Sequence, residues 1–320
     1  MKGFYSKICT KTYLIFAFSW MFLGTSKCKK VGKVENIVNQ DEFEITEKVQ
    51  VGQAMRTYKI HLPKQYYTLN KDLPLVLVFH GGGGSASNIE NQTGLSDKAD
   101  LENFVVVYPE GTPKGLLNLK TWNAGNCCAK NNEDDIAFVD KMIATIPIKY
   151  KIDKTKIYAT GHSNGAMLCY RIANELSTKI AAIAPNAGNF QLQESYNPER
   201  NVPVIHIHSK LDNNVTFTGG IGSASINKQY NTPIDSCLDV ISKRATCNSN
   251  KKIVVENALF TYYKWNACGN SDFEIDYYLT EDGGHSWPGG NKGSAMGDEP
   301  SKAFNNNDII WSFFKKHSIR

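Results

Sequence analysis

Five residues near the middle of the chain have the types and spacing needed for nucleophilic catalysis. Gly161-His162-Ser163-Asn164-Gly165 reads G-x-S-x-G, between the apolar run 156–160 and the stretch 166–173, which has apolar residues at helical spacing. A serine at such a junction projects from a tight turn, where glycines let the flanking backbones approach closely. The backbone amide of Asn164 would then face a negative charge that develops on a substrate oxygen. The motif is short enough to occur by chance, so its partners must be sought elsewhere.

The base that takes the serine proton must come from another part of the chain. His285 lies in the glycine-rich loop 282–290, directly after the last predicted strand. His317 follows an amphipathic stretch near the C-terminus and has no such setting. We therefore predict that His285 is the base.

A carboxylate is expected to orient the base and to stand between the serine and the histidine in chain order. Asp212 follows the apolar run 202–208, so we predict that it is the acid. A turn-capping role is the alternative, since Asp-Asn-Asn suits a turn. Asp235 and Asp239 are substitutes, within a polar segment that we interpret as a surface insertion.

A glycine run follows the strongest apolar stretch of the chain, and residues 79–85 read Phe-His-Gly-Gly-Gly-Gly-Ser. Because glycines let backbone amides face a substrate oxygen, Gly82 and Gly83 join Asn164 as predicted oxyanion donors. The sequence does not choose between the two glycines. A phosphate-binding loop is disfavoured, since no phosphate-loop or dinucleotide-binding context is present.

Several further side chains near these motifs are candidates for binding. Trp122, His162 and Trp287 are candidate substrate-binding residues, with a packing role as the alternative for each tryptophan. His206 and His208 share one face of a predicted strand and suggest a metal pair, but no third ligand and no C-x-x-C pair is evident. A hydrogen-bonded core role is their alternative, and we predict no metal and no other cofactor.

The elements that must position these residues follow an α/β pattern. Residues 43–62 indicate an antiparallel hairpin, and continuous apolar runs typical of buried parallel strands lie at 75–79, 104–108, 157–159, 181–184, 204–207 and 273–279. Helical patterns lie at 133–150, 164–176 and 301–316. We predict a mostly parallel sheet with helices on both faces, in which the catalytic candidates follow the carboxyl ends of strands.

These residues together resemble the poly(3-hydroxybutyrate) depolymerase-like esterases and the related secreted feruloyl and acetylxylan esterases. The resemblance spans about residues 55–318, and the matching segments are 78–83, 122–128, 134–138, 161–167, 284–290 and 309–314. It implies an α/β-hydrolase fold with Ser163, Asp212 and His285 where the family places its triad. The chain departs from the family at Ala166, where glycine is usual, at Ser209, and in a longer segment 217–250.

The N-terminus has the pattern of an export signal. Lys2, Lys7 and Lys11 precede the apolar run 13–23, which is too short to span a bilayer. We predict a signal peptide over 1–28, a polar tether over 29–42 and a single catalytic domain over 43–320. Two processing outcomes are open: cleavage near Ser26, or a lipid anchor at Cys28, which would be the protein's one link to a membrane.

Composition limits the partners of the chain. The formal charge of +5 comes largely from lysines of the first thirty residues, so nothing points to nucleic acid. Six cysteines follow the signal region, and disulfides are expected in an exported protein. Cys237 and Cys247 bracket the presumed insertion and are expected to pair, Cys268 to reach Cys127 or Cys128, and Cys169 to be a buried thiol.

The prediction is an exported, monomeric serine carboxylic-ester hydrolase that is secreted, periplasmic or anchored to the cell envelope. Its substrates are expected among feruloyl or acetyl esters of plant polysaccharides, or among hydroxyalkanoate esters. An acyltransferase or serine peptidase on the same fold is one alternative, and a non-catalytic binding protein is the other.

Overall fold

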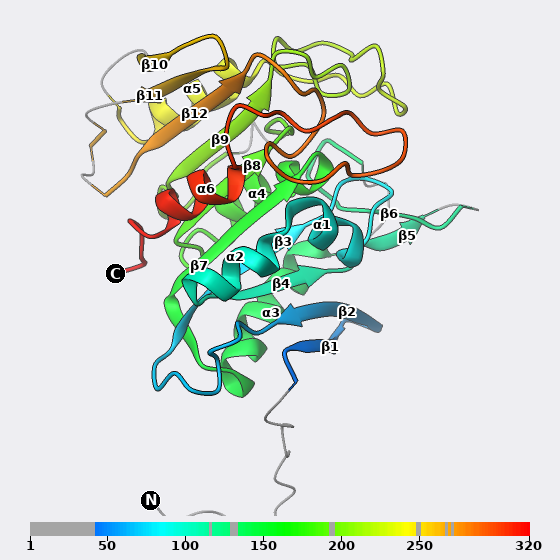
Figure 1. Ribbon diagram of the computed structural model, residues 1–320, viewed down its shortest axis with the longest axis vertical. Helices are drawn as coiled ribbons and strands as arrows, with labels where there is room; N and C mark the ends of the chain where they lie inside the picture. Colours follow the sequence, from blue (N-terminus) through cyan, green and yellow to red (C-terminus); the bar gives the residue numbers. More distant parts are fainter. Residues whose placement is uncertain are drawn as a thin grey trace, which may run out of the picture. The chain divides into compact units, whose positions relative to one another are not determined.

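A sheet of ten strands crosses the described part of the chain (Figure 1). The computed structural model describes residues 42–114, 117–128, 134–191, 196–247, 251–265, 268–269 and 272–320. Parallel strands form the middle of the sheet, in the order β4(Val105–Pro109), β3(Leu73–Phe79), β7(Ile152–His162), β8(Ala182–Asn186), β9(Val204–Ser209) and β12(Ile275–Thr280). An antiparallel pair extends each edge: β1(Glu44–Val51) with β2(Ala54–His61), and β10(Lys252–Glu256) with β11(Phe260–Trp265).

Helices cover both faces of this sheet. One set is α1(Ala86–Thr93), α2(Leu95–Glu102) and α6(Asn306–Phe314), and Figure 1 shows it in front of the sheet. The other set, on the opposite face, is α3(Asp135–Lys149), α4(Asn164–Glu175) and α5(Ile234–Arg244). Within β3, Val76 and Val78 pack with the first set, whereas Leu75, Leu77 and Phe79 pack with the second. Such burial on both faces explains the continuous apolar runs, and it confirms the predicted fold class.

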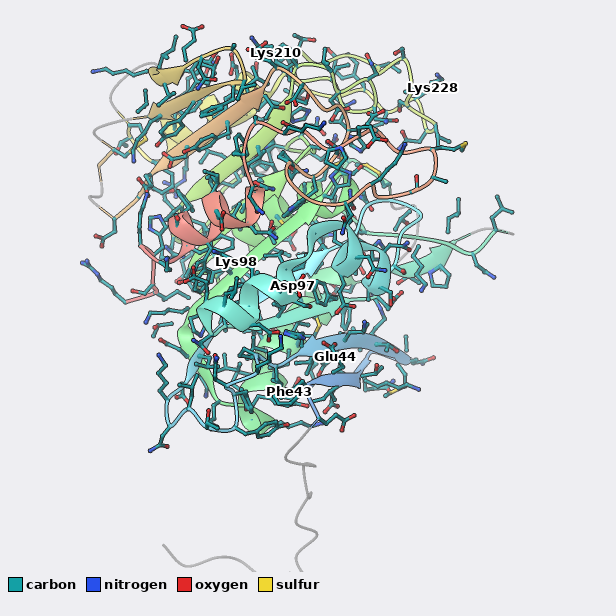
Figure 2. The ribbon with its side chains drawn as sticks, in the orientation of Figure 1. Phe43, Glu44, Asp97, Lys98, Lys210 and Lys228 are labelled. Atoms are coloured by element: carbon teal, nitrogen blue, oxygen red, sulfur yellow. A yellow bond between two sulfur atoms is a disulfide. The ribbon has the colours of Figure 1, made fainter. Side chains whose placement is uncertain are left out.

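Pairs of side chains fix the front helices to one another. Lys98 of α2, labelled in Figure 2, forms ion pairs with Glu102 at 3.0 Å and with Asp308 of α6 at 2.7 Å. The indole of Trp311 donates to Glu102 at 2.8 Å and its ring stacks on Phe104. The C-terminal helix is thus held against α2 by polar contacts as well as by core packing.

Three predicted helices exist, although one is shorter than its pattern. The third begins at Asn306 instead of 301, because Ser301 and the amide of Lys302 are bonded to Asp282 in a segment that is not helical. The predictions missed α1 and α2, whose sequences carry few apolar residues, and the small hairpin β5(Thr112–Lys114)–β6(Leu119–Thr121).

The interpretation of the polar segment around Cys237 and Cys247 as a surface insertion is wrong. Residues 234–244 form α5, an amphipathic helix that buries Cys237, Leu238 and Ile241 in the core. Asp235 therefore lies in the first turn of a helix that packs on the sheet, and Asp239 lies in the same helix. Because both substitute aspartates belong to this helix, Asp212 is the candidate acid that directly follows β9.

The expected disulfide pairing is also wrong. The bonded pairs are Cys247–Cys268 and Cys127–Cys128, while Cys237 lies in the core. Cys247 follows the C-terminal end of α5, where the amide of Gly269 donates to Ala245, so the tertiary fold brings Cys268 there. Cys169 is buried, as predicted.

The predicted signal peptide, residues 1–28, and the tether up to residue 41 lie outside the described residues. From residue 42 onward, the described segments belong to one compact unit. No helix in these segments is long and apolar enough to cross a membrane.

Candidate active site

Ser163 stands at the tip of the turn that joins β7 to α4. Its φ and ψ are 56° and −121°, a left-handed conformation that a residue with a side chain rarely adopts. A Cβ on Gly161 would lie 2.7 Å from the backbone of Gly165, and a Cβ on Gly165 would lie 2.2 Å from the carbonyl oxygen of Phe79. The two glycines of the motif are therefore required by close backbone contacts, which hold the strained serine in place.

This packing predicts a large cost for the variant Gly165→Ala. The new methyl group has rigid backbone on its contact side, so the free energy of unfolding should fall by about 3 kcal/mol or more. Denaturant unfolding measures the change. Gly82→Ala is the matched control, since its Cβ would have no neighbour nearer than 3.9 Å. Equal stability of the two variants would contradict the steric explanation.

Asp212 and His285 are in direct contact. The Nδ1 of His285 lies 2.8 Å from Oδ2 of Asp212, whose side chain is fully buried. The other carboxylate oxygen accepts the amides of Asn214 and Val215 at 2.9 and 2.8 Å. Burial opposes the charged carboxylate, but His285 and the other donors outweigh it and hold the pKa of Asp212 far below its usual range. Asp212 is thus ionised and fixes Nδ1 of His285 as a donor, which leaves Nε2 as the acceptor.

The loop that carries His285 is held from two sides. The backbone amide of His285 donates to Asp298 at 2.6 Å. Asn186, at the end of β8, donates to the carbonyl of Ser286 at 2.8 Å, and its own carbonyl accepts the amide of Ser163 at 3.0 Å. One residue therefore links the backbone of the serine turn to the backbone of the histidine loop.

His162 lies under the candidate base rather than in a substrate site. Its ring contacts that of His285, with centroids 4.6 Å apart, and its Nδ1 accepts from Asn186 at 3.0 Å. Burial, followed by the positive potential of His285, keeps the pKa of His162 well below its ordinary value. A neutral, buried ring is a support for His285, so the structure does not favour the predicted substrate-binding role.

Two backbone amides are suited to stabilise an oxyanion. Asn164 begins α4, and its amide is one of the first four, which have no acceptor within the helix. Gly81 lies close to the serine, since a Cβ on it would be 3.3 Å from Cβ of Ser163. The amide of Gly83 already donates to Lys120 at 2.7 Å, whereas that of Gly82 has no acceptor among the described residues. Of the two predicted glycines, Gly82 is therefore the better donor.

Buried side chains shape this glycine loop. His80 donates from Nδ1 to the carbonyl of Gly81 at 2.7 Å and accepts the amide of Gly111 at Nε2. Burial lowers the pKa of His80, which keeps the ring neutral as these two bonds require. The side-chain amide of Asn164 exchanges two bonds with the backbone of Trp122, at 2.7 and 3.1 Å. Trp122 thus joins the glycine loop, through His80, to the start of α4, through Asn164.

The two candidate tryptophans are packing residues. Trp122 has no exposed surface, and its indole donates to the carbonyl of His80 at 2.8 Å. Trp287 is equally buried and donates to Asn307 at 3.0 Å. Because neither ring has surface left for a ligand, the packing alternative fits both, and the proposed substrate contact does not.

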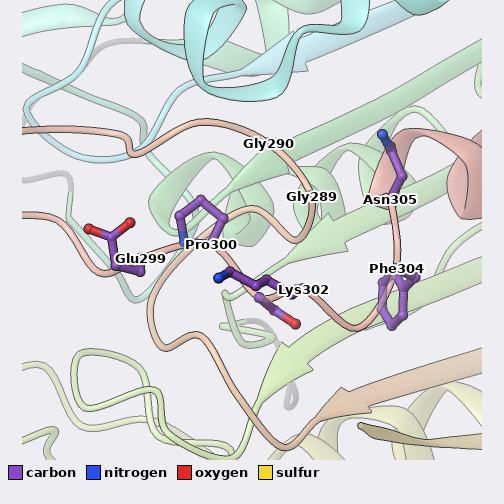
Figure 3. A pocket seen from close by; sticks show the side chains of 8 residues that line it. Gly289, Gly290, Glu299, Pro300, Lys302, Phe304 and Asn305 are labelled. Carbon is purple, nitrogen blue, oxygen red and sulfur yellow. The ribbon is translucent and has the colours of Figure 1, made fainter.

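A shallow cavity of about 400 Å³ lies beside the histidine loop (Figure 3). Gly289 and Gly290 line one side of it, and Phe304 and Asn305 line another. The candidate triad residues are not among the residues that line it. Its wall is the segment that braces the loop, since the carbonyl of Ser301 accepts the amide of Gly289 at 2.9 Å.

The histidine pair of β9 is hydrogen-bonded rather than arranged as ligands. His206 and His208 are buried and 3.0 Å apart at Nε2 and Nδ1. Among the described residues, no group of three or more His, Cys, Asp or Glu side chains is placed to hold a metal ion. The two histidines therefore fit the alternative of a hydrogen-bonded role in the core.

Sequence reasoning missed Asn186 and Asp298, which fix the backbone of the turn and the loop. Asn186 closely follows the apolar run 181–184, as Ser163 closely follows the run 156–160, so its place at the carboxyl edge of the sheet was a usable signal. Asp298 lies in a loop with no periodic pattern, and only the fold brings it to His285.

Comparison with known proteins supports an esterase. The model of the family described as esterase PHB depolymerase matches residues 56–230, more than half of the chain. "Putative esterase NocK" of Nocardia uniformis subsp. tsuyamanensis is 26% identical over 266 residues, covering 78% of this chain and 76% of that protein. The bifunctional acetylxylan esterase/xylanase XynS20E of Neocallimastix patriciarum is 28% identical over 73% of this chain, and feruloyl esterase B of Piromyces equi is 31% identical over 48%. The matched regions are 31% and 29% of those two longer proteins.

Solved structures show the same fold. An acetyl xylan esterase from Aspergillus awamori superposes with a TM-score of 0.60, at 12% identity, over 85% of this chain and 99% of that one. A thermostable esterase superposes with a TM-score of 0.52, at 15% identity, over 86% and 63%. The chain belongs to the esterase PHB depolymerase family, and it is a carboxylic ester hydrolase with the α/β-hydrolase fold.

Proposed function

We propose that this ester hydrolase works through an acyl-enzyme on Ser163, with His285 as general base and Asp212 as the acid that orients it. The observation that carries the proposal is the 2.8 Å contact between Asp212 and His285, on a ring that packs against the residue before Ser163. The strained turn at Ser163 adds to it, because such strain is a feature of exposed nucleophiles on this fold.

The proposed reaction follows from the hydrogen bonds. Asp212 holds a proton on Nδ1 of His285, so Nε2 accepts the Ser163 proton as Oγ attacks the ester carbonyl. The amides of Asn164 and Gly82 stabilise the oxyanion. The protonated His285 then gives its proton to the leaving alcohol. A water molecule, deprotonated by His285, attacks the acyl-enzyme in the second half, and the acid leaves as Ser163 regains its proton.

The proposed substrates are feruloyl or acetyl esters of plant polysaccharides, with hydroxyalkanoate esters as the second group. The relatives whose names contain acetylxylan esterase and feruloyl esterase support the first group, and the family description supports the second. Export is part of the proposal, supported by the three lysines and the apolar run 13–23 at the N-terminus. A monomer is the proposed state, and a lipid anchor at Cys28 is the proposed alternative to secretion.

The charge on His285 predicts a defined dependence on pH. Burial lowers the pKa of His285, but the carboxylate of Asp212 and, more weakly, Asp298 raise it, and the result lies above the ordinary value. His162, which also faces the ring, is neutral. Because the base must be unprotonated, kcat/KM should fall as the pH drops through a midpoint above about 6.5. A pH profile with a soluble ester measures the midpoint, and a value below that of an ordinary histidine would contradict the assignment.

A panel of esters tests the function. Acid release is measured with a short-chain nitrophenyl ester, methyl ferulate, acetylated xylan and a hydroxybutyrate oligomer, for the wild type and for Ser163→Ala. Hydrolysis that depends on Ser163 would support the mechanism, and the preferred ester would identify the substrate group. A folded wild type that hydrolyses none of the four would overturn the proposed substrates.

A further inference from the structure

A chain of buried polar side chains runs from the candidate acid back to the helix of the nucleophile. The Nε2 of His208 lies 3.3 Å from Oδ2 of Asp212 and 2.6 Å from the carbonyl oxygen of Val215. The Nδ1 of His208 is 3.0 Å from Nε2 of His206, whose Nδ1 is 2.7 Å from the hydroxyl of Tyr170. Both histidines and the tyrosine are at most 2% exposed.

The acceptors at one end fix the proton on Nε2 of His208, and burial favours one direction for the bonds that follow. A carbonyl oxygen only accepts, so Nε2 of His208 carries a proton and donates to Val215 and Asp212. With its proton on Nε2, the His208 ring presents Nδ1 as the acceptor for Nε2 of His206. His206 in turn accepts at Nδ1 from the hydroxyl of Tyr170. The low polarity of the core opposes a charge on His206 or a tyrosinate at Tyr170, so this neutral direction is the one that the burial favours.

These hydrogen-bonded side chains connect two elements that position triad residues. Tyr170 lies on α4, whose N-terminus is Ser163, and His206 and His208 lie on β9, which leads to Asp212. The helix that begins at the nucleophile and the loop that carries the acid are therefore linked through the core. Because Asp212 already accepts two amides and His285, the His208 proton is an additional donor that disperses the charge of the same oxygen, Oδ2, that faces His285.

We propose that Tyr170, His206 and His208 are positioning residues for the esterase reaction. They hold Asp212 at a fixed place relative to α4 and set how strongly its carboxylate acts on His285. The inference rests on the proposed roles of Ser163, Asp212 and His285. It extends them to three side chains that touch neither substrate nor reacting atoms.

The variant Tyr170→Phe removes the first donor and keeps the ring. We expect kcat to fall about 5- to 10-fold with KM unchanged, because His206 loses the proton that fixes its tautomer. Tyr277→Phe is the matched control: this buried ring also packs against His206, at 5.5 Å between centroids, but its hydroxyl has no hydrogen-bond partner in the described parts of the chain. A wild-type kcat in both variants, or equal losses of kcat in both, would overturn the proposal.

A second pair of variants, both at His208, tests how the network affects the pKa of His285. His208→Leu removes the donor to Asp212, so kcat should fall about 10- to 100-fold. The carboxylate of Asp212 then attracts the imidazolium more strongly, and the acid limb of kcat/KM should move up by about half a pH unit. Besides Asp212, the titratable groups that face His285 within the described segments are Asp298 and His162, and both remain unchanged. His208→Gln, which retains a donor near the position of Nε2, should recover part of the rate and restore the midpoint.

A purely structural role predicts lower stability with an unmoved midpoint, and that result would refute the inference. The pKa of His285 is also to be measured by NMR titration in the wild type, in His208→Leu and in His208→Gln. That measurement needs no substrate, so a wild type that hydrolyses no ester leaves it intact. Failure of the proposed function and failure of this inference are therefore distinct results: the first removes activity from the wild type, and the second leaves the His285 titration identical in all three proteins.

Discussion

Replacing Ser163 with alanine is expected to lower the rate of ester hydrolysis by about 10⁴-fold or more, while the protein remains folded. The loss is large because Ser163 is the proposed site of the acyl-enzyme, and the oxyanion donors alone retain only a small part of the acceleration. Stability should not fall, since Ser163 is held by its backbone, and its left-handed conformation is strained for serine and alanine alike. Initial rates with a nitrophenyl ester, together with a denaturation curve, give both quantities.

Ser85→Ala is the matched control for that prediction. Ser85 follows the glycine run of the oxyanion loop and caps α1, where its hydroxyl accepts the amide of Asn88 at 3.1 Å. Its loss should lower the free energy of unfolding by about 1 kcal/mol and leave kcat nearly unchanged. Comparable activity in Ser163→Ala and the wild type would exclude Ser163 as the nucleophile.

Asp212→Asn is expected to lower kcat by about 10⁴-fold, almost as much as the loss of the serine. The amide is nearly the same size as the carboxylate, but its nitrogen donates where His285 now donates to Oδ2. The ring would then present the wrong tautomer to Ser163, and the main negative charge that stabilises the imidazolium would be lost. The acid limb of the pH profile should also move down, because Asp212 is the main group that raises the pKa of His285.

A buried carboxylate elsewhere in the sheet separates this effect from a general loss of stability. Asp276 is buried on β12 and pairs with Lys264 at 3.6 Å, with no contact to His285 in the described residues. Asp276→Asn should retain most of the wild-type kcat. If both variants lose activity in proportion to their stability, the orienting role of Asp212 is wrong.

Position along the strands made much of the site predictable. Ser163 and Asp212 each follow an apolar run, and parallel strands bring their carboxyl ends to one edge of the sheet. The contact between Asp212 and His285 follows from that rule and from the chain order alone. This prediction does not depend on the residues that lie between Asp212 and His285 in the sequence.

What the sequence could not supply are contacts that depend on tertiary packing. Asp298 bonds the backbone of His285 from a loop without periodicity, and Cys247 pairs with Cys268 only because α5 packs on the sheet. The choice of Gly82 over Gly83 depends on one carbonyl of β6, that of Lys120. Trp122 was compatible with exposure or burial, because an aromatic residue beside an active site serves either purpose, and only the packing places it in the core.

The central claim is that ester cleavage passes through a covalent bond to Ser163. Its most direct test is to mix the wild type with a slowly hydrolysed ester, quench with acid within one turnover, and map the acyl group by mass spectrometry of peptides. The account predicts one acyl group on the peptide that contains Ser163, and none on the same peptide of Ser163→Ala. Hydrolysis at the wild-type rate with no acylated peptide, or with the acyl group on another residue, would contradict it.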